Sequence, residues 1–209
     1  MELSIIFLPL IASIISGFFG KYIGDRNSEI VTSLFVIVSA LLSISIFYNV
    51  ITNGYENNIV IASWINSGTL NVNWSIKIDP LSSVMLVVVT VISALVHIYS
   101  IGYMTHDPHK PRFMAYLSLF TFAMLTLVTA DNFLQLFFGW EGVGLCSYFL
   151  IGFWFKKDTA NAAAIKAFLV NRVGDFGLAL GIFLIFYLFG TVNYDEVFLK
   201  IPELVNKEI

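Results

Sequence analysis

Six long stretches with almost no charge constrain this chain more than any other feature of its sequence. Each runs for at least about 18 residues, close to the roughly 20 that a helix needs to cross the hydrocarbon core of a bilayer. The stretches cover residues 3–20, 30–50, 80–104, 113–130, 132–155 and 161–189. We therefore expect an all-α polytopic membrane protein with about six transmembrane helices, because helices satisfy every backbone polar group within lipid.

Composition excludes two alternatives to a membrane protein. Of the 209 residues, 58% are hydrophobic and 12% are charged, whereas an ordinary soluble domain has about 25% charged residues. Disorder needs low hydrophobicity and high net charge, but the net charge here is only -3.

The 11 basic residues form no dense run, which argues against nucleic-acid binding. The one cysteine, Cys146, cannot form an intrachain disulfide or a cysteine metal cluster by itself.

The segment between the second and third stretches has the period of a β-strand. Residues 70–78 alternate strictly between apolar and polar side chains. A shorter apolar run at 59–65 precedes them, and residues 66–69 have the composition of a turn. We expect a short β-hairpin whose apolar face lies against the helix ends, with Trp64 and Trp74 near the membrane interface.

Basic residues gather in alternate loops between the stretches. Six of the 11 follow the first, third and fifth stretches, namely Lys21, Arg26, Lys110, Arg112, Lys156 and Lys157. By the positive-inside rule, these loops face the cytoplasm or the matrix. The N-terminus is therefore expected on the outer side of the membrane.

Charged residues at membrane depth are the candidates for function. Glu141 lies ten residues past Asp131, which places it about 15 Å into a core of roughly 30 Å. A charge at the membrane centre costs about 2.5 to 3.5 kcal/mol and is rarely kept without a role. Glycines at 139, 142 and 144 favour close helix packing around it. We expect Glu141 to be enclosed by protein and to exchange a proton; the alternative is a neutral glutamate that hydrogen bonds between helices.

The sixth stretch carries three further charges. Arg172 and Asp175 are three residues apart, so they share one helix face and are expected to pair. Lys166 is nine residues from Asp175, about 180° around the helix, and cannot partner it. Lys166 either extends to the interface or belongs to a proton path. His97, in the third stretch, is expected to hydrogen bond between helices rather than to relay protons.

Several sequence blocks are specific enough to suggest a family. They are Asp-Pro-Leu-Ser at 79–82, His-Ile-Tyr-Ser-Ile-Gly-Tyr-Met at 97–104, Phe-Gly-Trp-Glu-Gly-Val-Gly-Leu-Cys-Ser-Tyr at 138–148, Ala-Ile-Lys-Ala-Phe at 164–168 and Asn-Arg-Val-Gly-Asp at 171–175. Together they resemble the antiporter-like membrane subunits of respiratory complex I. The most similar branch is subunit L of NADH-quinone oxidoreductase, also called chain 5.

The resemblance implies roles for particular residues. Glu141 would be the proton-translocation residue, and Arg172 and Asp175 would be a charge pair that supports the same half-channel. In the family, the glutamate pairs with a lysine on a later, discontinuous helix, for which this sequence has no counterpart. Family members are several times longer, so the chain is expected to be truncated relative to them.

The resemblance also implies a division of the chain into three parts. Residues 1–112 would hold the first three helices and the outer hairpin, at about 58–79. Residues 113–193 would begin the proton-translocating helical repeat. Residues 194–209 would form an amphipathic surface tail.

The function implied is that of a membrane-arm subunit of a proton-pumping NADH:quinone oxidoreductase, with no activity expected from this chain alone. A subunit of a multisubunit cation/proton antiporter, or a truncated fragment that does not pump, is the alternative. No cofactor or metal is expected on this chain, since NADH, FMN, iron-sulfur clusters and quinone bind other subunits of the complex. The expected partners are other membrane-arm subunits and the lipid bilayer, but not nucleic acid. The membrane would be the bacterial cytoplasmic or the mitochondrial inner membrane.

Overall fold

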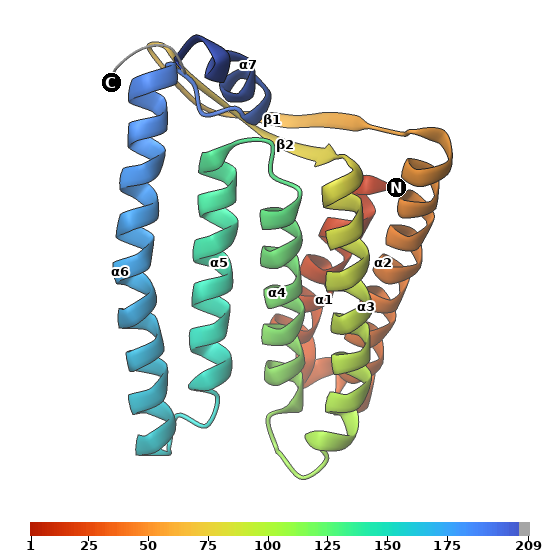
Figure 1. The fold of residues 1–209 in the computed structure, drawn as a ribbon. Helices are drawn as coiled ribbons and strands as arrows, with labels where there is room; N and C mark the ends of the chain where they lie inside the picture. Colours follow the sequence, from red (N-terminus) through yellow and green to blue (C-terminus); the bar gives the residue numbers. More distant parts are fainter. Residues whose placement is uncertain (205–209) are drawn as a thin grey trace.

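A computed structural model describes residues 1–204 and consists mainly of long helices that run side by side (Figure 1). The long helices are α1 (Glu2–Ile23), α2 (Asp25–Asn53), α3 (Pro80–Tyr103), α4 (Lys110–Val128), α5 (Phe133–Ile151) and α6 (Asp158–Phe189). All six are long and apolar enough to cross a membrane. The expected fold class, with a two-stranded sheet between the second and third helices, is thereby confirmed.

The first two helices differ from their expected bounds at the end where they meet. We expected residues 21–29 to form a loop, but α1 continues to Ile23 and α2 begins at Asp25. Gly24 makes the whole connection with φ at 87°, a value that side-chain-bearing residues rarely adopt. Charged residues do not by themselves end a helix, whereas a residue with positive φ does, so the helices extend up to this glycine.

Helix α4 lies at the centre of the arrangement. It packs against α1, α2, α3 and α5, and α6 then packs against α5 at the end of the row (Figure 1). Because α6 stands at the edge, much of its surface is open in this chain, and Val173 and Phe176 are 77% and 66% exposed. Such exposed apolar faces fit contact with lipid or with other membrane helices.

The expected hairpin forms from β1 (Asn57–Ser67) and β2 (Leu70–Ile78) and lies across the helix ends near the N-terminus (Figure 1). Ile76 and Ile78 are buried in a cluster with residues of α1, α2, α3 and α4. Trp64 and Trp74 meet edge to face, with ring centroids 5.2 Å apart. The apolar face therefore lies against the helices, as the alternation predicted.

A glutamine side chain joins this hairpin to the helices. The Ser75 backbone N–H donates to Oε1 of Gln135 at 2.9 Å, and Nε2 of Gln135 donates to the Ser75 carbonyl at 2.6 Å. The amide thus occupies the place of a neighbouring strand and satisfies two backbone groups of a buried residue. The sequence pattern does not predict this contact.

Asp131 connects three parts of the chain at the same end of the molecule. Its carboxylate accepts hydrogen bonds from the side-chain amides of Asn58, Asn132 and Asn193. Its carbonyl accepts from the backbone N–H of Tyr194, the first residue of α7 (Tyr194–Leu204). Burial and then the Asp131 charge raise the pKa of Tyr194, so its hydroxyl stays protonated. The amphipathic tail expected at 194–209 begins here as a helix; residues 205–209 lie outside the described residues.

We expect Asn132→Ala to lower the stability of the chain moderately. Oδ1 of Asn132 accepts from the backbone N–H of Gln135 at 2.8 Å and caps α5, a contact worth about 0.5 to 2 kcal/mol. Asn132→Ser keeps the capping oxygen and is expected to recover most of the loss. Thermal unfolding in detergent micelles measures both variants, and equal melting temperatures for Ala and Ser would contradict the capping role.

Candidate functional site

Glu141 faces an arginine on the neighbouring helix. Nη1 of Arg172, on α6, donates to both Oε1 and Oε2 of Glu141, on α5, at 2.6 Å each. Helical spacing predicts the pair of Arg172 with Asp175 alone, because spacing reports contacts within one helix. The rotation and packing of two helices decide an interhelical pair, and only the structure provides these.

Asp175 completes the charge cluster from the next turn of α6. Its Oδ2 lies 3.7 Å from Nη1 of Arg172, so the predicted intrahelical pair is present. Its Oδ1 accepts a hydrogen bond from Nε1 of Trp140 at 2.8 Å. Sequence reasoning missed Trp140, although an indole N–H within the membrane requires a partner, and this requirement was a usable signal.

The three charged side chains differ in their burial. The exposed fractions are 8% for Asp175, 24% for Glu141 and 48% for Arg172. The expectation that Glu141 is enclosed by protein is thus met only in part. The physical reason is its position at the edge of the helix row, where α6 is the one described long helix that packs against this side of α5.

The glycines beside Glu141 do bring helices together. A Cβ added at Gly139 would lie 2.7 Å from the backbone of Leu127 on α4, and one at Gly142 would lie 3.1 Å from the Ala123 side chain. Helix α5 is therefore held tightly against α4 while its charged residue points toward α6. No atom lies within 4 Å of a Cβ at Gly144, so that glycine has no packing role among the described residues.

Two other candidate residues lie away from this cluster. Lys166 is exposed and forms no ion pair with any residue from 1 to 204. His97 is buried, and its Nε2 lies 3.0 Å from Oγ of Ser118 on α4 while its Nδ1 faces the Ser93 carbonyl at 2.8 Å. The expected role of His97 as a hydrogen-bonding link between helices is confirmed.

The cluster has the chemistry of a charge switch. Two carboxylates share one guanidinium, and the shorter contacts go to Glu141. A proton on Glu141 removes its charge and weakens that ion pair, which leaves Arg172 free to pair with Asp175. Within residues 1–204, no three His, Cys, Asp or Glu side chains are grouped so that they could hold a metal ion.

We expect Asp175→Asn to be milder than Asp175→Ala. The asparagine keeps an oxygen that can accept from Nε1 of Trp140, whereas alanine removes this hydrogen bond, a loss of about 0.5 to 1.5 kcal/mol. The melting temperature in micelles reads out the difference. Identical values for the two variants would argue that hydrogen bonding at Asp175 does not matter.

Two family models match the chain. The model for the N-terminus of chain 5 of NADH-ubiquinone oxidoreductase (complex I) matches residues 64–114. The model for the transmembrane region of NADH:quinone oxidoreductase and Mrp antiporters matches residues 130–208 and so includes the whole charge cluster.

Curated relatives match over nearly the whole chain. It is 53% identical over 207 residues to NADH-ubiquinone oxidoreductase chain 5 of Chondrus crispus, covering 99% of this chain and 31% of the relative. It is 51% identical over 209 residues to NADH-quinone oxidoreductase subunit L of Rickettsia bellii, covering 100% of this chain and 33% of the relative. The chain thus spans about a third of the length of these relatives.

Two solved structures share the fold. A chain of the membrane-bound sulfane sulfur reductase, an archaeal respiratory membrane complex, aligns with a TM-score of 0.82 at 18% identity, over 98% of this chain and 41% of that one. A chain of the Mrp complex from Dietzia sp. DQ12-45-1b aligns with a TM-score of 0.81 at 23% identity, over 99% and 21%. Because the chain is more than 50% identical to these curated relatives, it belongs to the family of complex I membrane subunits that includes chain 5 and subunit L.

Proposed function

We propose that this chain forms part of a membrane-arm subunit of a proton-pumping NADH:quinone oxidoreductase and carries part of a proton half-channel. The observation that supports this most is the cluster between α5 and α6. There Arg172 contacts Glu141 at 2.6 Å and faces Asp175 at 3.7 Å. Carboxylates and their partners at membrane depth are typical of proton relays.

In this proposal, Glu141 takes up and releases the transported proton. When Glu141 is charged, it forms an ion pair with Arg172. When Glu141 is protonated, Arg172 pairs with Asp175 instead. Trp140 positions Asp175 through the indole N–H and keeps this second carboxylate in place. Each proton that binds or leaves thus shifts one arginine between two partners, which couples proton uptake to movement of α6 against α5.

Orientation and partners belong to the same proposal. The connections α1–α2, α3–α4 and α5–α6 lie at the end opposite the hairpin, and six basic residues lie in or directly beside them: Lys21, Arg26, Lys110, Arg112, Lys156 and Lys157. This end faces the cytoplasm or matrix by the positive-inside rule, which puts the N-terminus outside. Further membrane-arm subunits or helices cover the open face of α6. In this proposal, residues 1–112 hold the first three helices and the outer hairpin, and residues 113–193 begin the proton-translocating repeat.

A subunit of a cation/proton antiporter is the second candidate. The likeness to the Mrp complex, with a TM-score of 0.81, favours it as far as the fold is concerned. Against it, the relatives above half identity are named as subunits of NADH-ubiquinone or NADH-quinone oxidoreductase. The two candidates differ in the source of energy, since the first draws on electron transfer and the second on a cation gradient.

Identifying the energy source therefore tests the proposed function and distinguishes the two candidates. In sealed membrane vesicles that hold the assembled complex, NADH is expected to generate a pH gradient, measured with a pH-sensitive dye. A sodium gradient imposed without NADH is expected to generate none. A pH gradient that depends on sodium and does not change with NADH would indicate that the chain belongs to an antiporter instead.

A further inference from the structure

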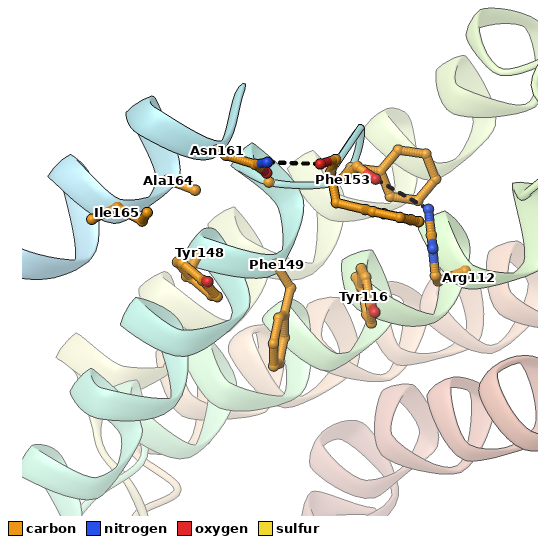
Figure 2. A pocket seen from close by; sticks show the side chains of 10 residues that line it. Arg112, Tyr116, Tyr148, Phe149, Phe153, Asn161, Ala164 and Ile165 are labelled. Carbon is orange, nitrogen blue, oxygen red and sulfur yellow. Dashed lines mark hydrogen bonds between the residues drawn. The ribbon is translucent and has the colours of Figure 1, made fainter. Parts of the chain in front are cut away.

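A cavity of about 350 Å³ opens between α4, α5 and α6 at the basic end of the molecule (Figure 2). It lies apart from Glu141, toward the loop between α5 and α6. Half of its ten lining residues are aromatic, none of them is acidic, and one is a positively charged arginine, Arg112. Such a combination of rings and one cation is suited to a ligand with a negative charge and an apolar body.

Arg112 is held in place but keeps free hydrogen-bonding capacity. Its guanidinium lies 4.5 Å from the ring centroid of Phe153 and 5.3 Å from that of Phe155, and Nη2 donates to the Phe153 carbonyl at 3.1 Å. Its Nε is buried without a hydrogen-bond partner, and Arg112 forms no ion pair within residues 1–204. A guanidinium has five N–H donors, so most of its capacity for an anion is unused.

The start of α6 adds further positive potential beside the cavity. Asn161 and Ala164, from the first two turns of α6, line it (Figure 2). No side chain caps this helix N-terminus at Lys157, and among its first N–H groups those of Ala160 and Asn161 donate to the Lys157 carbonyl, which leaves those of Asp158 and Thr159 for an anion. Lys156 and Lys157 precede the helix directly and Asp158 begins it, so these three side chains, two positive and one negative, add one net positive charge.

The position of the cavity points to lipid as the source of the anion. Arg112 is the third residue of α4, so it lies at the boundary between membrane and water. Two apolar lining residues are open to the surroundings, Phe155 at 53% and Ile165 at 51% exposure. A free phosphate ion would make no favourable contact with these apolar surfaces, whereas the acyl chains of a phospholipid would cover them. Basic pockets between membrane helices on this side bind anionic head groups.

We propose that this cavity binds the phosphate of an anionic glycerophospholipid from the leaflet on the basic side. The phosphate oxygens accept from Arg112 and from the first turn of α6, while the lipid body lies along Phe155 and Ile165. Such a lipid would fill the cavity between α4, α5 and α6. The site is distinct from the charge cluster and does not depend on the proposed proton transport.

Native mass spectrometry of the full chain in micelles tests the site with phosphatidylglycerol and phosphatidylcholine as probes. We expect the wild type to retain phosphatidylglycerol in preference to phosphatidylcholine. Arg112→Gln is expected to lower this retention about tenfold, as for the loss of one charge-assisted hydrogen bond. Arg26→Gln removes an exposed positive charge from the same end and is expected to change nothing.

A second pair of variants keeps Arg112 and so tests the site even if the Arg112→Gln variant misfolds. Asn161→Asp places a negative charge in the lining and is expected to reduce phosphatidylglycerol binding, whereas the neutral Asn161→Ser is expected to preserve it. Equal lipid retention by the wild type, Arg112→Gln and Asn161→Asp would overturn the proposal. Displacement of the lipid by millimolar inorganic phosphate would overturn the lipid assignment and identify a site for free phosphate.

Discussion

Gly139→Ala is expected to force α4 and α5 apart and to prevent the chain from accumulating in membranes. The added Cβ would lie 2.7 Å from the N, Cα and Cβ atoms of Leu127. Carbon atoms in contact normally lie about 3.5 to 4.0 Å apart, and a helix backbone cannot rotate away as a flexible side chain can. Overpacking costs about 1 to 3 kcal/mol, occasionally more, and a clash with backbone belongs at the upper end.

Gly144→Ala is the matched control for this prediction. Gly144 lies on the same helix, five residues further, and a Cβ there would meet no atom within 4 Å. Alanine favours a helix over glycine by about 1 kcal/mol, so this variant is expected to be neutral or slightly stabilising. The yield and melting temperature of each variant in micelles are the measurements. Equal behaviour of the two variants would show that the close contact at Gly139 is absent.

Hydropathy and period were sufficient to predict the architecture. Long apolar runs identify spans because no other arrangement satisfies backbone groups in lipid, and strict alternation identified the hairpin. Helix ends were harder to predict. Glu29, expected at the edge of the second span, is buried within α2, where Lys110 on α4 lies 3.8 Å away. A partner from another helix made a buried charge tolerable, and sequence spacing gives no information about such a partner.

The charge cluster could be predicted only in part, because sequence spacing gives no information about partners on another helix. The Arg172 and Asp175 pair follows from helical geometry alone. The contacts of Arg172 with Glu141 and of Trp140 with Asp175 join separate helices and depend on their relative rotation. Gly139 and Gly142 signalled a close neighbour for α5, but not that this neighbour would be α4, with α6 left facing the glutamate.

Glu141→Gln is expected to abolish proton flux through the proposed half-channel while the subunit still assembles. The glutamine has nearly the same volume and keeps an oxygen that can accept from Arg172, so packing between α5 and α6 is preserved. The amide does not exchange a proton in the physiological range. Loss of a proton-transferring side chain lowers rates by about 10²- to 10⁴-fold, and we expect a loss of at least that order.

An exposed glutamate provides the matched control for this substitution. Glu56 lies between α2 and β1, outside the spans, and its change to glutamine alters the charge of the chain by the same amount. Glu56→Gln is expected to pump as the wild type does. A loss of pumping in both variants would indicate a general effect of charge rather than a role of Glu141.

The ratio of protons translocated to NADH oxidised, measured in the same sealed vesicles, tests the proposed role of Glu141 most directly. Glu141→Gln is expected to lower this ratio while immunoblots show the complex at its normal level. A ratio equal to that of the wild type, with the complex fully assembled, would contradict the assignment of proton translocation to the cluster of Glu141, Arg172 and Asp175.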